Sequence, residues 1–353
     1  MTLNPEMLVL AREAKGIVQG DFAKLMRVSQ GTVSRWETGL LEPPASAIKE
    51  FGELLDVAPE FFGRSERVYG FNSTVFFHRR RQSGTDKVLR KLHARMNILR
   101  MRIGVLLRSA QIESPHTFEH FDSSEYQGRI ETIAQMVRAH WRMAPGYVRS
   151  VVKSIEDAGG ILFRMDFETR SIDAISEWVP GYPPIILVNS NAEIPASRLR
   201  HTLAHELGHL ALHQLASALD AELEADRFAA EFLMPRREIK ASLYRLNLNK
   251  LLDLKQEWKV SMASLVYHAN RLGTITPSQY KNLYVNLRRR WGLHEPYEEH
   301  IPEEKPALLQ EIVGVHVAEF KYGPAEMAKL LFYAKRSDFE AEFLNAPKMR
   351  LVS

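Results

Sequence analysis

The amino-acid sequence predicts a mainly α-helical protein with one small β-sheet: an all-α domain, then an α+β domain, then a helical C-terminal extension. Three observations lead to this fold class. Four short amphipathic segments occupy about the first 60 residues, β-type apolar runs are confined to residues 161–189, and helical spacing resumes after them. The expected domain boundaries are 1–62, 63–118 (a basic linker and helix), 119–243 and 244–353.

The first domain is predicted from helices separated by residues that end helices. Gly16 follows the first apolar segment, and Gly39 follows the third at a position suited to a left-handed cap. The pair Pro43-Pro44 separates the third segment from the fourth. The resulting helices are expected at residues 6–14, 19–26, 30–37 and 45–55.

The rest of the chain is divided in the same way by changes in apolar spacing. Residues 64–82 look extended or irregular. Helices are then expected at 86–110, at 125–141 and from Pro145 to about residue 159. Strands are expected at 161–165, 172–179 and 182–189. Helices follow at 195–213, 219–233 and 247–291, and most of the last 50 residues are predicted to be helical.

Composition limits the chemistry that the chain can use. Its 353 residues include no cysteine, which excludes disulfides and thiolate metal sites, so any metal ligands must be His, Asp or Glu. The longest apolar runs, such as residues 185–188, are far shorter than the roughly 20 residues that span a membrane. The N-terminus lacks the basic-then-apolar layout of a secretory signal. A cytoplasmic protein without a membrane partner is the simplest prediction.

Charge is distributed unevenly along the chain. Residues 1–62 carry 6 Lys or Arg against 9 Asp or Glu, residues 63–110 carry 12 against 2, and residues 236–291 carry 12 against 3. Two basic belts suggest a polyanionic partner. Two solvated helix faces are the alternative, and charge alone leaves both interpretations open.

The segment 203–209 contains the pattern H-E-x-x-H on a predicted helix. Residues four apart on a helix differ by about 40° in direction, so the imidazoles of His205 and His209 face the same way and can bind one ion. The pattern is short enough to occur by chance. Two ordinary histidines on a helix surface are the alternative interpretation.

The next predicted helix supplies acidic residues at a useful spacing. A catalytic zinc site usually has three protein ligands and an open position for water. Glu222 is the predicted third ligand, and Asp226, four residues later on the same face, is expected to accept the second ring N–H of one histidine. Glu224 is the alternative third ligand, and a solvated acidic face is the alternative for the whole segment.

A longer stretch around this pattern resembles the ImmA/IrrE family of zinc metallopeptidases. The resemblance is carried by residues 198–203, by the H-E-L-G-H core, and by the Phe-Ala-Ala and Leu-Met-Pro elements between residues 228 and 235. The preceding strand at 184–189 also fits the layout of that family, and the similarity covers about residues 120–240. The resemblance implies a zincin-like α+β metallopeptidase domain that binds Zn²⁺ through His205, His209 and Glu222, with Glu206 as the catalytic carboxylate.

The chemistry expected of such a site follows from charge. Zinc lowers the pKa of a bound water and polarises the scissile carbonyl, and Glu206 is expected to carry the water proton to the leaving amine. His213, Tyr182 and His201 are candidate donors to the oxyanion, with an ordinary helix-end role as the alternative for His213. If the strand at 184–189 lies at the sheet edge, its backbone is able to pair with an extended substrate.

Residues 17–39 resemble the Xre/Cro-type helix-turn-helix family. Ser29 is a credible N-cap of its second helix, the recognition helix, which lies in the major groove in that geometry. The buried positions are matched by Ala23, Val28, Val33 and Trp36. The side chains predicted to contact double-stranded DNA are Gln19 at a phosphate and Gln30, Thr32, Ser34 and Arg35 at base edges or phosphates.

Two alternatives stay open for these helical segments. The net negative charge of residues 1–62 also suits a bundle that binds protein, although the basic belt behind it, which includes Arg79, Arg80 and Arg81, supplies attraction for phosphates. Residues 261–273 look like the helical extension often found behind the peptidase core of this family. Together with residues 288–291 they form either a second nucleic-acid surface or a structural subdomain.

These features predict a DNA-binding transcriptional regulator with a zinc-dependent endopeptidase domain. Its substrate is expected to be a repressor or antitoxin-like protein, in stress response, mobile-element control or toxin–antitoxin control. Two-fold operators imply a homodimer. The alternatives are a transcription factor whose peptidase-like domain senses a ligand, and an antitoxin that binds a partner without cleavage.

Overall fold

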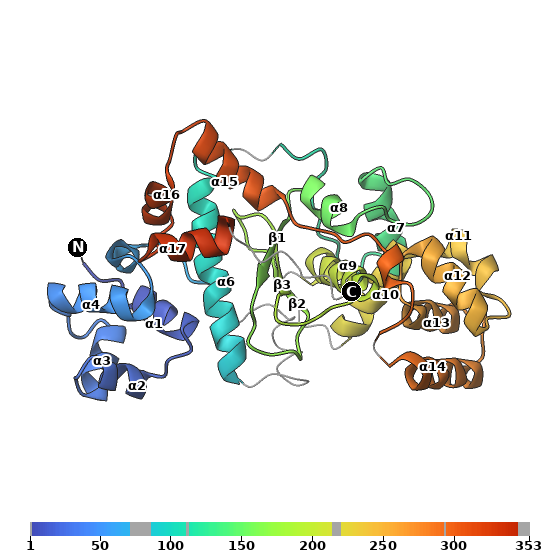
Figure 1. The fold of residues 1–353 in the computed structure, drawn as a ribbon, viewed down its shortest axis with the longest axis horizontal. Helices are drawn as coiled ribbons and strands as arrows, with labels where there is room; N and C mark the ends of the chain where they lie inside the picture. Colours follow the sequence, from blue (N-terminus) through green and yellow to red (C-terminus); the bar gives the residue numbers. More distant parts are fainter. Residues whose placement is uncertain (1, 71–85, 111–112, 214–219, 293, 345–353) are drawn as a thin grey trace. The chain divides into compact units, whose positions relative to one another are not determined.

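The computed structural model describes residues 2–70, 86–110, 113–213, 220–292 and 294–344 (Figure 1). These residues form two compact units. The first contains residues up to 70 together with 86–110 and 307–344, and the second contains 113–306. The segment 244–353, which the sequence groups as one helical extension, therefore contributes to both units. None of the described helices combines the length and apolarity needed to cross a bilayer.

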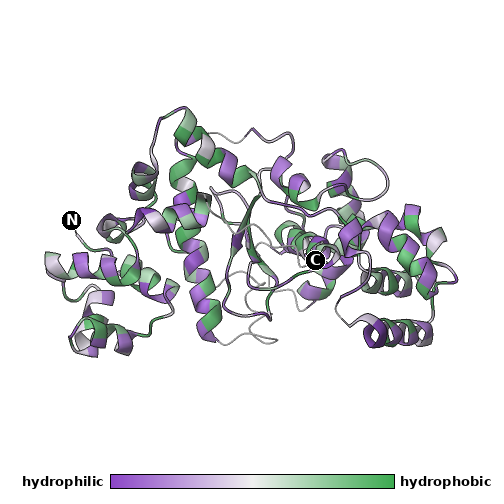
Figure 2. Ribbon diagram, viewed as in Figure 1, coloured by the Kyte–Doolittle hydropathy of each residue, from purple (hydrophilic) through white to green (hydrophobic). Residues whose placement is uncertain are grey.

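The four helices predicted at the N-terminus are confirmed. Figure 2 shows hydrophobic and hydrophilic positions on each of them, as amphipathic packing requires. Asn4 caps the first helix by accepting from the Glu6 N–H at 3.1 Å, and Ser29 caps the third in the same way through the Thr32 N–H. The elements are α1 (Pro5–Ala14), α2 (Gln19–Leu25), α3 (Gln30–Glu37) and α4 (Ala45–Leu55), followed by the 3₁₀ turn η1 (Pro59–Gly63).

An aromatic cluster holds these helices together. The ring of Phe51 on α4 lies 5.6 Å from Phe22, 5.4 Å from Trp36 and 5.8 Å from Phe62, between ring centroids. Such contacts contribute about 0.5–1.5 kcal/mol each beyond the burial of area. The long helix α6 (Asp86–Leu106) adds Ala94, Ile98 and Met101 to the same core. Helix α6 is therefore a packed part of the first unit.

The C-terminal helices belong to this unit because α6 anchors them. The Arg102 guanidinium donates to the Leu331 carbonyl at 3.0 Å and to the Tyr333 hydroxyl at 2.7 Å, and it stacks on the Tyr333 ring. The backbone N–H of Ala58 donates to the Phe332 carbonyl at 2.9 Å. The elements are α15 (Leu308–Ala318), α16 (Pro324–Leu330), α17 (Arg336–Phe339) and a π-helical turn at Glu340–Leu344.

A three-stranded sheet lies in the second unit. It consists of β1 (Ile161–Met165), β2 (Ala174–Glu177) and β3 (Ile185–Asn189), in the order β1-β3-β2. Strand β3 pairs in parallel with β1 and antiparallel with β2. The hypothesis that the strand at 184–189 pairs with substrate from a sheet edge is therefore wrong. Both sides of β3 already form backbone ladders, which leaves no free edge for a peptide.

Two helices of the second unit begin later than the sequence predicts. Helix α7 (Ile130–His140) starts after Gln127 and Gly128, whose φ angles of 55° and 67° are left-handed and interrupt a helix. Helix α8 (Val151–Asp157) starts well after Pro145, because Gly146 has a φ of 88° and Ser150 provides the N-cap. The remaining elements are α9 (Ala196–Leu212), α10 (Ala221–Leu233), α11 (Arg236–Ile239), η2 (Lys240–Leu243), α12 (Leu248–Trp258), α13 (Met262–Arg271), α14 (Pro277–Trp291) and η3 (Glu298–His300).

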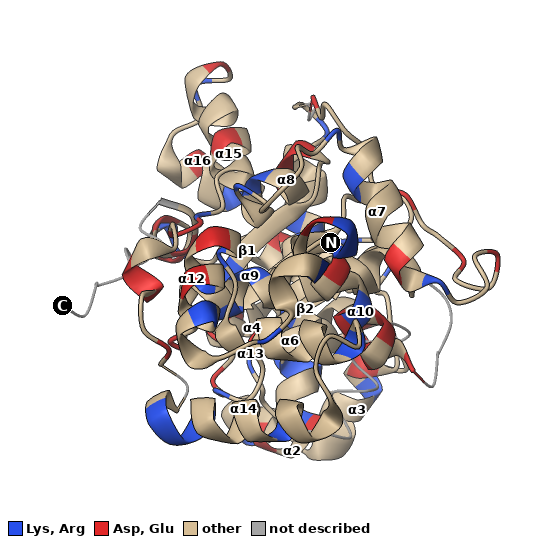
Figure 3. Cartoon of the chain, turned by 90° about the vertical axis from the view of Figure 1, so that its right-hand side faces the viewer, with Lys and Arg blue, Asp and Glu red and all other residues tan. Residues whose placement is uncertain are grey.

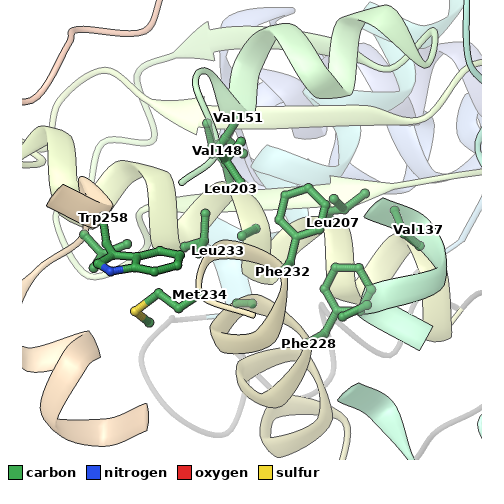
Figure 4. Close-up of a cluster of buried hydrophobic side chains, with 14 of the residues drawn as sticks. Val137, Val148, Val151, Leu203, Leu207, Phe228, Phe232, Leu233, Met234 and Trp258 are labelled. Atoms are coloured by element: carbon green, nitrogen blue, oxygen red, sulfur yellow. The ribbon is translucent and has the colours of Figure 1, made fainter. Parts of the chain in front are cut away.

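Helices α9 and α10 pack directly against each other. Phe228 and Phe232 of α10 stack with centroids 5.8 Å apart, beside Leu207 of α9 and Val137 of α7 (Figure 4). All four side chains are buried. Burying a Phe side chain contributes about 1.5–3 kcal/mol, so this contact fixes the separation of α9 and α10.

Gly208 allows the close approach of α9 to α10, and we expect Gly208→Ala to lower the free energy of unfolding by about 1–3 kcal/mol. A Cβ at this position lies 3.1 Å from both the Ala225 Cα and the Phe228 Cβ. That crowding outweighs the roughly 1 kcal/mol of helix propensity that alanine adds. Urea unfolding followed by tryptophan fluorescence measures the change.

Gly314 provides the matched control. It lies in α15, and a Cβ added there meets no atom within 4 Å. Gly314→Ala is therefore expected to be neutral or stabilising by up to about 1 kcal/mol. Equal effects of the two substitutions on stability would contradict the packing argument.

Candidate metal centre and nucleic-acid interface

Three potential ligands converge between α9 and α10. His205 and His209 lie one turn apart on α9, both are buried, and their Nε2 atoms are 3.0 Å apart. Glu222, in the first turn of α10, places Oε2 3.5 Å from His205 Nε2 and Oε1 3.4 Å from His209 Nε2. One ligand atom from each of the three residues lies within 4.8 Å of the others. The structure thus brings together the three residues that the sequence predicts as metal ligands.

The donor set and its spacing fit a small divalent cation. Two ligands that are about 2.0–2.1 Å from a tetrahedral zinc ion lie about 3.3 Å from each other, close to the three separations found here. Glu222 Oε1 is buried and forms no well-oriented hydrogen bond within the described residues. Two imidazoles and one carboxylate form a known catalytic zinc set. The unsatisfied oxygen and the donor types both favour a cation at this point.

The outward-facing nitrogens of the two imidazoles have partners of their own. His205 Nδ1 lies 2.8 Å from Asp226 Oδ1, the contact expected for Asp226. His209 Nδ1 lies 3.1 Å from His213 Nδ1, and His213 Nε2 lies 2.9 Å from Glu224 Oε2. Glu224, the alternative third ligand, therefore contacts His213 and is outside the three-residue group. The supporting position of His213 was missed, although its spacing of four residues from His209 signals it.

Burial and ion pairing oppose each other in the pKa values of this cluster. Burial lowers the pKa of His205, but contacts with Asp226 and Glu222 outweigh it and raise that pKa to about 9. The pKa of His209 is lowered to about 4, mainly by burial. Burial raises the pKa of the Glu222 carboxyl, yet the two adjacent imidazoles bring it well below its usual range. Glu222 is therefore ionised at neutral pH, as a metal ligand must be.

Glu206 follows the first histidine and is completely buried. Its Oε2 accepts a hydrogen bond from the Ser176 hydroxyl of β2 at 2.7 Å, which holds the carboxylate in one orientation. The sequence does not predict this role of Ser176, because the residue lies in a strand without a recognisable motif. Of the candidate oxyanion donors, His213 is engaged with His209 and Glu224, Tyr182 lies in a turn before β3, and His201 has its pKa lowered to about 4 by burial.

The predicted DNA contacts lie on α2 and α3. Gln30 and Arg35 are exposed, while Gln19, Thr32 and Ser34 are half-buried. The Gln19 amide donates to Glu37 Oε2 at 3.0 Å and accepts from Gln30 Nε2 at 3.2 Å. This contact links the starts of the two helices of the helix-turn-helix.

The sequence predicts that the first basic belt, residues 63–110, attracts DNA phosphates, but two of its arginines are buried in the structure. Arg79, Arg80 and Arg81 lie outside the described residues. Arg100 and Arg102 are buried within the first unit, where Arg102 binds the C-terminal segment. Buried guanidinium groups with protein partners contribute little to binding a phosphate backbone.

Comparison with protein families finds two matches. Residues 8–62 match the family described as Helix-turn-helix, and residues 155–270 match the IrrE N-terminal-like domain family, whose members are metallopeptidase-type domains. The two matches correspond to the fusion that the sequence resembles. Comparisons with curated proteins and with solved structures returned no significant match.

Proposed function

We propose that this chain, which joins an Xre-like helix-turn-helix domain to an ImmA/IrrE-type domain, is a transcriptional regulator that also cleaves a protein. The regulator binds double-stranded DNA, and the second domain is a zinc-dependent endopeptidase. Its substrate class is a repressor or antitoxin-like protein. We further propose that it works in the cytoplasm as a homodimer on a two-fold operator.

The observation that carries this proposal is the convergence of His205, His209 and Glu222 beside the oriented carboxylate of Glu206. A zinc ion held by these three residues supplies an acidified water and a polarised carbonyl. Both imidazoles are buried. Because little water surrounds buried groups, electrostatic interactions between them are stronger than at the protein surface.

The protein's own groups then have separate tasks. Glu206 takes a proton from the attacking water and returns it to the leaving amine, so the peptide C–N bond breaks without net consumption of the carboxylate. Ser176 holds the Glu206 carboxylate through its hydroxyl. Asp226 and His213 fix the orientations of His205 and His209.

DNA binding is assigned to the exposed edge of α3. Gln30 and Arg35 are available to base edges or phosphates, with Thr32 and Ser34 beside them. Gln19 contacts Gln30 and Glu37 and is placed at the start of α2, where a phosphate contact is expected. The match to the helix-turn-helix family supports this role.

A proteomic comparison of cells that express wild type or Glu206→Gln tests the peptidase. The amide keeps the size of the side chain but does not accept the water proton, which reduces general-base catalysis by about 10²–10⁴. We expect at least one protein fragment, with a new N-terminus, to occur only in wild-type cells. The metal content of both purified proteins is measured in parallel, because Glu206 is not among the ligands.

Identical fragment patterns, with equal metal content in both proteins, would reject the peptidase. If substitutions in α3 still abolished gene regulation in that case, the second domain would be a sensor or a binding module. Loss of metal in Glu206→Gln would contradict the assignment of Glu206 as a residue that does not bind the metal.

A further inference from the structure

Helix α14 presents an unusually wide exposed face. Only a narrow stripe, formed by buried Leu287 and the partly buried Tyr280, Leu283 and Trp291, packs against the core of the second unit. Apart from the half-buried Tyr284, the rest of the helix is exposed to solvent. The exposed residues are Pro277, Ser278, Gln279, Lys281, Asn282, Val285, Asn286, Arg288, Arg289 and Arg290.

The charge on this face has one sign. The 15 residues of α14 include four basic side chains and no acidic one, although the whole chain is nearly balanced with 47 Lys or Arg and 43 Asp or Glu. A helix face that serves only for solubility usually mixes both signs in ion pairs. In the part of the chain that the structure describes, no carboxylate forms an ion pair with Lys281, Arg288, Arg289 or Arg290.

The acidic residue that follows α14 most closely is already engaged. Glu295 receives a hydrogen bond from the buried Lys255 at 2.9 Å and another from the Met262 backbone N–H at 2.7 Å. Lys255 also pairs with Glu298. Lys255 of the second basic belt, residues 236–291, is therefore neutralised in the interior, whereas the four cations of α14 are exposed. Figure 3 shows blue, basic positions on α14.

Aromatic contacts hold two of the guanidinium groups. Arg288 lies over the Tyr284 ring, 5.3 Å from its centroid, and Arg290 lies over Trp291 at 4.7 Å. Arg288 also donates to the Tyr284 hydroxyl at 3.0 Å. Partial ordering of these long side chains lowers the entropy lost when they bind a partner. Asn282 and Asn286 add neutral hydrogen-bonding groups to the same helix.

The neighbouring helix α13 is not able to take this role. The α12–α13 turn repeats the α2–α3 turn closely: Lys259 and Arg27 have φ angles of 56° and 55°, and each is followed by Val and an N-capping Ser. In α3, Gln30 and Arg35 are exposed, but no residue of α13 is exposed. The repeated turn therefore builds a packing helix in the second unit, and α14 is the helix that faces outward.

We propose that the exposed face of α14 is a second DNA-binding surface, which contacts the phosphates of double-stranded DNA through Lys281, Arg288, Arg289 and Arg290. A helix of this length spans about 22 Å, enough to follow several phosphates along a groove. The asparagines and Gln279 supply further hydrogen bonds to the backbone. The surface lies beyond residue 270, where the match to the IrrE N-terminal-like family ends.

The test replaces all four cations with glutamine in the full-length protein. Binding to a fluorescein-labelled DNA duplex of mixed sequence is measured by anisotropy over a range of salt concentrations. Each lost phosphate contact is expected to reduce the slope of log affinity against log salt by about 1, so the variant loses up to about 4 in slope. The same measurement in an Arg35→Ala background separates this surface from α3.

A second variant controls for net charge. It replaces four other exposed lysines, Lys87, Lys153, Lys305 and Lys329, with glutamine, and it should keep the wild-type slope. Circular dichroism checks that α14 stays folded. An unchanged slope in the α14 variant, or an equal loss in both variants, overturns the proposal. A third contrary outcome is lost binding to vesicles of phosphatidylserine and phosphatidylcholine while DNA binding persists, because α14 would then bind a lipid surface.

Discussion

His209→Ala is expected to abolish stoichiometric zinc binding by the purified protein. Among the described residues, His209 is one of the three side chains that converge on the candidate centre, and its Nε2 faces both His205 Nε2 and Glu222. Removing an outer partner of a zinc ligand already weakens binding by about 10–100-fold, and removing the ligand itself should cost more. Competition with a chromogenic chelator, together with elemental analysis, measures the affinity and stoichiometry.

A graded series makes this prediction specific. His213→Leu removes the partner of His209 Nδ1 but leaves all three ligands in place, so an intermediate loss of about 10–100-fold is expected. His294→Leu removes an exposed histidine outside the cluster and should leave zinc affinity unchanged. Equal zinc binding by wild type and His209→Ala would place the metal elsewhere. Equal affinity of wild type and His213→Leu would reduce the His213 contact to packing.

The largest change in stability is expected for Arg200→Met. Arg200 and Glu304 form an ion pair in which the side chains are 1% and 4% exposed, and Arg200 also donates to the Val148 carbonyl. Removing one partner of a buried pair typically costs about 3–5 kcal/mol, because the remaining charge is left without compensation. Here Glu304 keeps hydrogen bonds from the Ser150 hydroxyl and the Val152 N–H, which places the expected loss near 3 kcal/mol.

Arg198→Met is the matched control, two residues earlier on α9. Its side chain is 47% exposed and pairs with Asp173, so its loss should cost at most about 1 kcal/mol. Urea unfolding followed by fluorescence is well suited to both variants because four of the five tryptophans lie in the second unit. These four tryptophans are Trp141, Trp178, Trp258 and Trp291. A similar loss of stability in both variants would mean that the buried pair has no special role.

Much of the local structure was predictable because its signals are local. Helices α1 to α4 follow from apolar spacing and from end signals such as Gly39. The apolar runs within residues 161–189 predict the three strands that the structure contains there. The late starts of α7 and α8 were not predicted. The start of α7 depends in part on the left-handed Gln127, and a non-glycine residue in that conformation gives no warning in sequence. The start of α8 depends on the left-handed Gly146 and on the Ser150 cap.

The candidate site shows the same division. Sequence alone determined that His205 and His209 share a helix face, because that follows from 3.6 residues per turn. It left Glu222 and Glu224 as alternatives, since either side chain is within reach of a neighbouring helix. The packing of α10 on α9, which requires Gly208, brought Glu222 to the imidazoles and Glu224 to His213. Which of the two glutamates faces the imidazoles therefore depends on tertiary contacts.

Sequence by itself therefore determined the order of the helices and strands, the resemblance to two families and the residue types at the metal centre. Tertiary structure decided which strand is central, which acid faces the histidines and which basic residues are exposed. Arg102 and Arg288 illustrate the reason: both lie in basic belts, but one is buried against the C-terminal segment and the other is open to solvent. Exposure depends on contacts between residues far apart in the chain, and local composition does not contain them.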